Sequence, residues 1–165
     1  MSRPRADLSS SNRHPSPGIE ISSISVPPTP ALSGILETAL HVDDIDRASR
    51  FYEDILGLAR IGGDVRFRAY SVANRDVLLL FKRGENSLPL TLPGGVIPPH
   101  GSSGQLHVAF SIAESDLEQW ETHLAANSIL IESRVRWPLG GRSVYFRDPD
   151  AHLLELATPG LWSIY

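Results

Sequence analysis

The sequence contains no cysteine, and no apolar run approaches the length needed to cross a bilayer. The missing thiol excludes disulfides, thiolate metal ligands and a cysteine nucleophile. Positive charge is not in excess, because 15 Lys and Arg residues stand against 19 Asp and Glu and the net charge is −4. The basic surface of a nucleic-acid-binding protein is therefore absent. We expect a protein that contacts neither nucleic acid nor membrane.

Composition divides the chain into three parts. Residues 1–33 are rich in Ser, Pro and Arg and lack apolar periodicity, which predicts a disordered tail. This tail also lacks the apolar stretch of a secretory signal, so we expect a cytoplasmic protein. Residues 34–160 are long enough for one domain with its own core. Residues 161–165 form an apolar end that packs either on this domain or at an interface.

The order strand, helix, strand, strand, strand occurs twice, in residues 35–84 and 105–160. Glu37 and His107 are 107 − 37 = 70 residues apart and precede capped helices, whereas Leu79 and Glu155 are 155 − 79 = 76 apart. A loop insertion of six residues accounts for the difference. We therefore predict an α+β fold in which tandem βαβββ modules form a curved, partly open mixed sheet around a cleft.

Periodicity and turn residues place the individual elements. The continuous apolar run at 77–81 favours a strand buried on both faces. The Gly- and Pro-rich segment 84–104 is expected to be a long loop without regular structure, which is often functional. The expected helices cover 45–57 and 117–127, and the expected strands cover 35–42, 58–61, 65–72, 77–81, 105–112, 129–137, 143–146 and 152–157.

Glu155 lies inside an apolar strand, where an unpaired carboxylate is costly to bury. It either points to solvent or has a partner such as a cation, a hydrogen-bond network or a metal. Folding the repeats side by side brings Glu37, His107 and Glu155 from neighbouring strands toward one spot. Alone, an exposed Glu or a hydrogen-bonded core His is the commoner explanation for each. Together, one His and two carboxylates favour a catalytic metal site with open positions.

Three stretches resemble the vicinal-oxygen-chelate superfamily, which includes glyoxalases, bleomycin- and fosfomycin-resistance proteins and extradiol dioxygenases. They are residues 37–58, 106–110 and 145–155, within a similarity over about 34–160. The resemblance implies that Glu37, His107 and Glu155 are the metal ligands and that Tyr145 donates a hydrogen bond to substrate. Glu37 replaces the usual His or Gln, and Leu79 stands where glyoxalase I enzymes have a fourth ligand.

The resemblance implies a divalent-metal-dependent, glyoxalase-like enzyme, a lyase or transferase, that acts on a small substrate with neighbouring oxygens. Mn, Ni, Zn or Fe would act as the Lewis acid. Glu155 could serve as base, Tyr145 as oxyanion donor, and His41 as a second base or substrate contact, unless His41 is simply a histidine near a strand end. A ferrous extradiol-type dioxygenase and a non-catalytic drug- or metabolite-binding protein are the alternatives. A homodimer is expected, with the partner completing the cleft.

Overall fold

The structure is a computed structural model that describes residues 29–165. Residues 34–165 form one compact unit. The disordered tail predicted for 1–33 falls, up to residue 28, outside the described residues. Among the described helices, none is long and apolar enough to cross a membrane.

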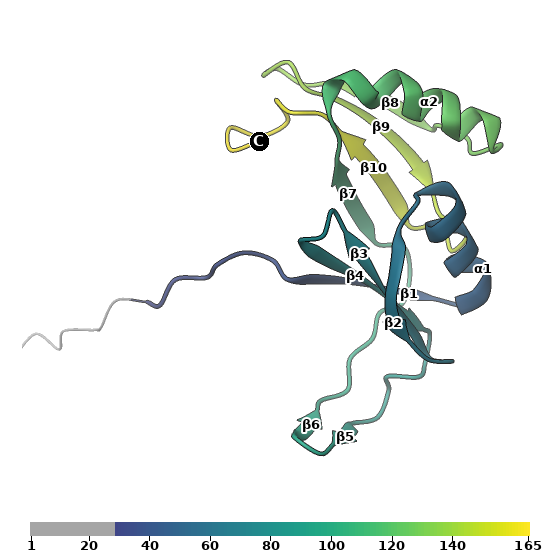
Figure 1. Cartoon of the computed structure of the whole chain (residues 1–165), viewed down its shortest axis with the longest axis vertical. Helices are drawn as coiled ribbons and strands as arrows, with labels where there is room; N and C mark the ends of the chain where they lie inside the picture. The colour runs from purple at the N-terminus through teal and green to yellow at the C-terminus, as the bar shows by residue number, and fades with distance from the viewer. Residues whose placement is uncertain (1–28) are drawn as a thin grey trace, which may run out of the picture. The chain divides into compact units, whose positions relative to one another are not determined.

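The first module has the predicted βαβββ order (Figure 1). Its sheet has the strand order β1-β4-β3-β2, in which β1 and β4 are parallel and the other neighbours antiparallel. Its elements are β1 (Glu37–Val42), α1 (Ile45–Arg50), the π-helical η1 (Phe51–Ile55), β2 (Ala59–Gly63), β3 (Phe67–Val72) and β4 (Asp76–Lys82).

The second module repeats this topology, with the strand order β7-β10-β9-β8 and a parallel pair β7–β10. A short hairpin, β5–β6, lies between the modules in sequence and stands apart from both four-stranded sheets in Figure 1. These elements are β5 (Leu90–Leu92), β6 (Gly95–Ile97), β7 (His107–Ser111), the 3₁₀ helix η2 (Glu114–Asp116), α2 (Leu117–Ala126), β8 (Ser133–Arg136), β9 (Arg142–Arg147) and β10 (Leu153–Ala157).

Strand register confirms the internal repeat. Ala39 pairs with Leu79 in the first sheet, and Ala109 pairs with Glu155 in the second. The same offsets, 109 − 39 = 70 and 155 − 79 = 76, separate the equivalent positions in the sequence. The α+β fold of tandem βαβββ modules is therefore confirmed, and its strands form two separate mixed sheets.

Several boundaries differ from the predictions. The helix expected over 45–57 begins at the Asp44 cap, whose carboxylate accepts from the amides of Asp46 and Arg47, but its second half is π-helical. The strand expected over 129–137 is formed only at 133–136. The loop expected over 84–104 contains the β5–β6 hairpin.

The prediction that the strand at 77–81 is buried on both faces is wrong for the single chain. Leu78 and Leu80 are buried, whereas Val77, Leu79 and Phe81 are only partly covered. Leu78 and Leu80 face the helices and belong to the core, together with Leu40, Tyr52 and Tyr70. The other face of the sheet, which carries Glu37 and Leu79, keeps apolar surface that the chain itself does not cover.

Buried polar groups join the two modules. Tyr52, in the π-helical η1, donates a hydrogen bond to Asp148 of the second module over 2.9 Å. His152 accepts from the amide of Leu106, so its other ring nitrogen carries the proton and donates to the carbonyl of His41 over 2.9 Å. Burial raises the pKa of Asp148, and burial together with this carboxylate raises the pKa of Tyr52 well above its usual value. We call these contacts between the modules, made by Tyr52, Asp148 and His152, the joint. It therefore depends on buried groups.

Replacing Tyr52 tests this joint. Tyr52→Phe removes the only side-chain donor to one oxygen of the buried Asp148, so we expect a loss of about 1–3 kcal/mol in the free energy of unfolding, measured in urea. Tyr70→Phe is the matched control, because Glu53, the partner of Tyr70, also accepts from Arg60. We expect the control to lose less than about 1 kcal/mol, and equal losses would contradict the role assigned to the joint.

Candidate metal centre

Two of the three predicted metal ligands meet in the second module. Because β7 and β10 are parallel neighbours, His107 and Glu155 lie diagonally across the pair, and His107 Nε2 is 3.3 Å from Glu155 Oε2. Tyr145 pairs directly with Glu155 on the adjacent β9, and its ring stacks on that of His107 at 6.2 Å between centroids. Only 3% of Glu155 is exposed, whereas the His107 side chain is 48% exposed. We call His107, Glu155 and Tyr145 together the half-site.

The hydrogen bonds of the half-site fit a bound cation. His107 Nδ1 lies 3.0 Å from the carbonyl of Leu153, which can only accept, so Nδ1 carries a proton. In the neutral ring, Nε2 then turns a lone pair toward the carboxylate of Glu155. Two acceptors in contact repel each other unless a second proton or a cation lies between them. Two atoms about 2.1 Å from one ion lie roughly 3.0–3.4 Å apart, which matches the observed separation.

The second oxygen of Glu155 supports the same interpretation. Glu155 Oε1 is fully buried and, within residues 29–165, has no hydrogen-bond partner. A buried carboxylate oxygen without a partner carries a large desolvation penalty. A divalent ion bound by this carboxylate and by the imidazole would offset that penalty, and the carbonyl of Leu153 would fix the ring as a second-shell partner. The residues of the half-site therefore fit a metal ion.

Tyr145 is suited to donate a hydrogen bond. Burial raises the pKa of its phenol, and the neighbouring Glu155 carboxylate raises it further. The hydroxyl therefore stays protonated at neutral pH and can donate to an oxygen of a bound molecule.

The third predicted ligand, Glu37, is not part of the half-site in the single chain. It is exposed at the start of β1, in the first sheet, opposite Val77. Within residues 29–165 no three His, Asp or Glu side chains are grouped so that they could hold a metal. The structure thus brings His107 and Glu155 together and leaves Glu37 and His41 outside that pair.

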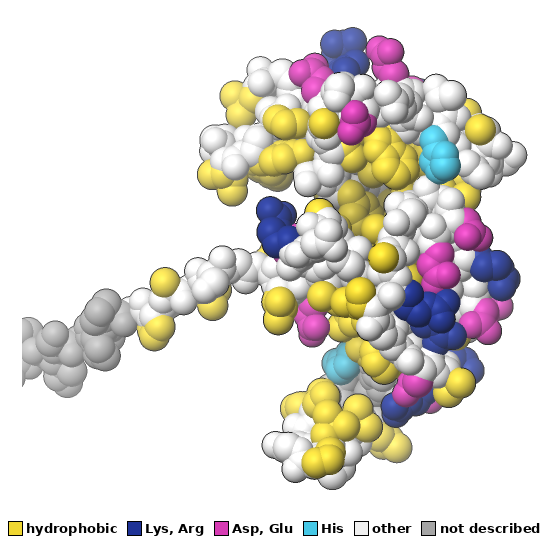
Figure 2. All heavy atoms as spheres, in the orientation of Figure 1, with side chains coloured by type: hydrophobic (Ala, Val, Ile, Leu, Met, Phe, Trp, Pro, Cys, Tyr) yellow, Lys and Arg dark blue, Asp and Glu magenta, His cyan; other side chains and the backbone are white. Residues whose placement is uncertain are grey.

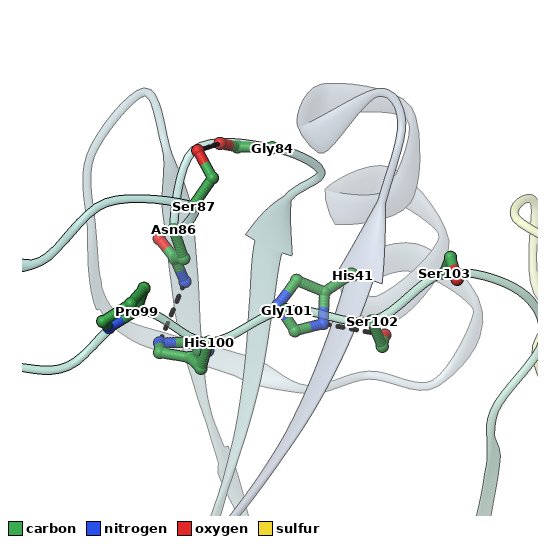
Figure 3. Close-up of a pocket in the computed structure, with 9 residues that line it drawn as sticks. All are labelled: His41, Gly84, Asn86, Ser87, Pro99, His100, Gly101, Ser102 and Ser103. Atoms are coloured by element: carbon green, nitrogen blue, oxygen red, sulfur yellow. Dashed lines mark hydrogen bonds between the residues drawn. The ribbon is translucent and has the colours of Figure 1, made fainter.

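His41 lines a different hollow, of about 600 Å³, at the far end of β1 (Figure 3). Its ring is only 6% exposed and stacks on Phe81, with 5.7 Å between centroids. Ser102 contacts its Nδ1 at 3.1 Å, whereas its buried Nε2 has no partner among the described residues 29–165. In Figure 3 this free nitrogen faces the side of the hollow where His100 lies, and the two rings are 5.8 Å apart.

Comparison with known proteins decides the family. The model of the Glyoxalase/Bleomycin resistance protein/Dioxygenase superfamily matches residues 34–156. The chain belongs to this superfamily. A metallothiol transferase FosB from Staphylococcus saprophyticus is 30% identical over 77% of this chain and 78% of its own.

Solved structures of the superfamily share the fold. The crystal structure of a lactoylglutathione lyase from Agrobacterium tumefaciens has a TM-score of 0.73 and 36% identity, over 80% of this chain and 98% of its own. A glyoxalase/dioxygenase from Nostoc punctiforme has a TM-score of 0.60 and 27% identity, over 81% and 98% of the two chains. The similar proteins are thus named as a metallothiol transferase, a lactoylglutathione lyase and a glyoxalase/dioxygenase.

Two groups of residues were missed by sequence reasoning. Asp148 and His152, which join the modules, lie in a stretch that we interpreted only as a turn and the start of a strand. His100 and Ser102, which cover His41, lie in an aperiodic loop, and no spacing rule relates such a loop to a distant strand. A contact between a buried polar residue and a loop side chain leaves no periodic pattern in the sequence. It can be recognised only in the three-dimensional structure.

Acid should weaken the contacts of His41. Burial, and then the nearby His100, Arg83 and His152, lower the pKa of His41, so the folded protein favours its neutral form. The stability that the neutral ring contributes is complete above its unfolded pKa of about 6.5 and is lost as the pH falls below that value. We expect the fall in the free energy of unfolding between about pH 8 and about pH 5 to be smaller in His41→Gln than in the wild type.

Urea unfolding at several pH values measures this difference. His123→Gln, at an exposed histidine of α2, is the control and should keep the wild-type slope. An unchanged slope in His41→Gln would show that burial of His41 does not disfavour its protonated form.

Proposed function

We propose that this protein is a divalent-metal-dependent, glyoxalase-like enzyme that acts on a small substrate with neighbouring oxygens. Glu37, His107 and Glu155 hold the ion in this proposal. The observation that carries it is the buried carboxylate of Glu155, which within residues 29–165 has one oxygen without a partner and the other 3.3 Å from Nε2 of His107. A lyase or transferase reaction agrees with the names of the relatives, a metallothiol transferase and a lactoylglutathione lyase.

A homodimer completes the site in this proposal. One chain supplies two ligands from the second module, and its own Glu37 is not grouped with them. A second copy can place its β1, and with it Glu37, against the half-site. The edge strands β1 and β7 are both unpaired on one side in the single chain, which leaves them open to such an approach.

The bound ion would supply Lewis-acid chemistry, polarising a carbonyl or epoxide oxygen of the substrate. The side chains around it position that substrate. Tyr145 donates a hydrogen bond to a substrate oxygen on which negative charge develops. Glu155, as the buried carboxylate, accepts a proton from the substrate. Ala109 and Ser111, exposed on the same face of β7, leave room beside these groups.

The substrate in this proposal carries a thiol or reacts with one. Metallothiol transferase and lactoylglutathione lyase both name sulfur compounds, and both proteins match more than three quarters of this chain. The chain itself has no cysteine, so the sulfur has to come from the substrate or a co-substrate. Small carbonyl compounds and epoxides, each offered together with a low-molecular-weight thiol such as glutathione, are therefore the first substrates to test.

Metal content tests the proposed function. We expect the wild type, purified without chelator or reconstituted with Mn, Ni, Zn or Fe, to retain about one ion per chain by elemental analysis. His107→Ala and Glu37→Gln each remove a ligand and should weaken retention by about 10-fold or more. His123→Ala, at an exposed histidine outside the site, should retain metal like the wild type.

The other outcomes distinguish the alternatives. A wild type that binds none of these ions contradicts the metalloenzyme. Metal retention with oxygen consumption on catechols, and no thiol-dependent turnover, would indicate a ferrous dioxygenase instead. Metal-independent binding of a drug or metabolite, without turnover, would indicate a sequestering protein.

A further inference from the structure

The segment between the two sheets has an unusual composition. From Asn86 to Ala113 there is no Asp, Glu, Lys or Arg, although 21% of the whole chain is charged. This stretch contains the β5–β6 hairpin and all of the edge strand β7. We call residues 84–104 the arm. Depletion of charge is typical of the buried core of a protein interface.

The base of the arm is fixed on the first module. Arg83 binds Asp43 over 2.6 Å and donates to the carbonyl of Ser102 over 3.1 Å. The returning strand of the arm is held to the outgoing one, because the amide of His100 donates to the carbonyl of Asn86 over 3.0 Å. Ser102 also contacts the buried ring of His41 (Figure 3). The arm is therefore held to the first module at its root.

The tip of the arm is apolar and uncovered. Figure 2 shows hydrophobic side chains gathered on the hairpin, which lies apart from the body of residues 34–165. A two-stranded hairpin is marginally stable by itself in water, and so many exposed aliphatic side chains indicate a surface that another molecule covers. The exposed fractions are 76% for Leu88, 39% for Leu90, 46% for Leu92, 61% for Val96 and 43% for Ile97.

We propose that the arm packs against a second copy of this chain. This inference rests on the homodimer of the proposed function. The arm ends at Gly104, three residues before His107, and β7, which begins at His107, is an edge strand of the second sheet. A copy that brings its Glu37 to His107 therefore lies next to the end of the arm. In a two-fold dimer each copy contributes one arm, and the contact occurs twice.

The composition of the arm disfavours a membrane as the occupant. Segments that bind membrane surfaces combine apolar side chains with Lys or Arg that contact anionic headgroups. The arm has neither Lys nor Arg between Asn86 and Gly104. An uncharged, apolar hairpin suits the self-complementary interface of two identical chains better.

Charges placed at the tip test the arm. We expect the double variant Leu88→Glu, Val96→Glu to raise the dimer dissociation constant about tenfold or more in sedimentation equilibrium, because burying carboxylates in an apolar contact is costly. Ile61→Glu with Val65→Glu is the matched control, since these side chains are also exposed, 59% and 79%, but lie outside the arm. The control should dimerise like the wild type. Circular dichroism establishes that both variants are folded.

The outcomes separate this proposal from the proposed function. A monomeric wild type, or an arm variant that dimerises like the wild type, overturns the docking of the arm. A monomeric wild type that co-sediments with phosphatidylcholine vesicles identifies a membrane as the occupant and overturns it as well. A dimer that depends on the arm but binds no metal leaves the arm proposal standing and removes the metalloenzyme.

Discussion

The site depends on the burial of one carboxylate, that of Glu155. Glu155 lies in the middle of β10, 3% exposed, between strands that carry His107 and Tyr145. Within residues 29–165 one oxygen has no hydrogen-bond partner, and the other lies 3.3 Å from Nε2 of His107, whose Nδ1 proton points to the carbonyl of Leu153. A second proton on the imidazole or a bound cation stabilises this arrangement, and the family to which the chain belongs includes metal-dependent enzymes.

The duplicated module explains how the ligands come to lie where they do. Each module pairs its first and last strands in parallel. Positions 70 residues apart in the two first strands, and 76 residues apart in the two last strands, therefore occupy the same place in each sheet. In the second module this place holds Glu155, and in the first module it holds Leu79. The first module therefore contributes only Glu37 to the proposed metal site, from an exposed strand end. The apolar face beside Glu37 is incompletely covered in the single chain.

The sequence predicts what is periodic and local. Alternation in the strands, the Asp44 cap and the repeat offsets predict the two βαβββ modules, and the lone Glu155 in an apolar strand indicates half of the site. The β5–β6 hairpin, the cover over His41 and the π-helical turn were not predicted, because they depend on contacts between distant, aperiodic segments. The repeat led us to expect that Glu37 converges with His107 and Glu155. Within one chain, however, the two sheets are separate. Strand pairing inside a module does not indicate which module or chain approaches the open edge.

Mixing two inactive chains tests most directly whether a second copy completes the metal site. Glu37→Gln and His107→Ala are refolded together, and metal is measured in the mixture by elemental analysis. In a mixed dimer one site combines Glu37 of one chain with His107 and Glu155 of the other, so random pairing should restore about a quarter of the wild-type metal. A mixture that retains no more metal than the separate variants would contradict the account.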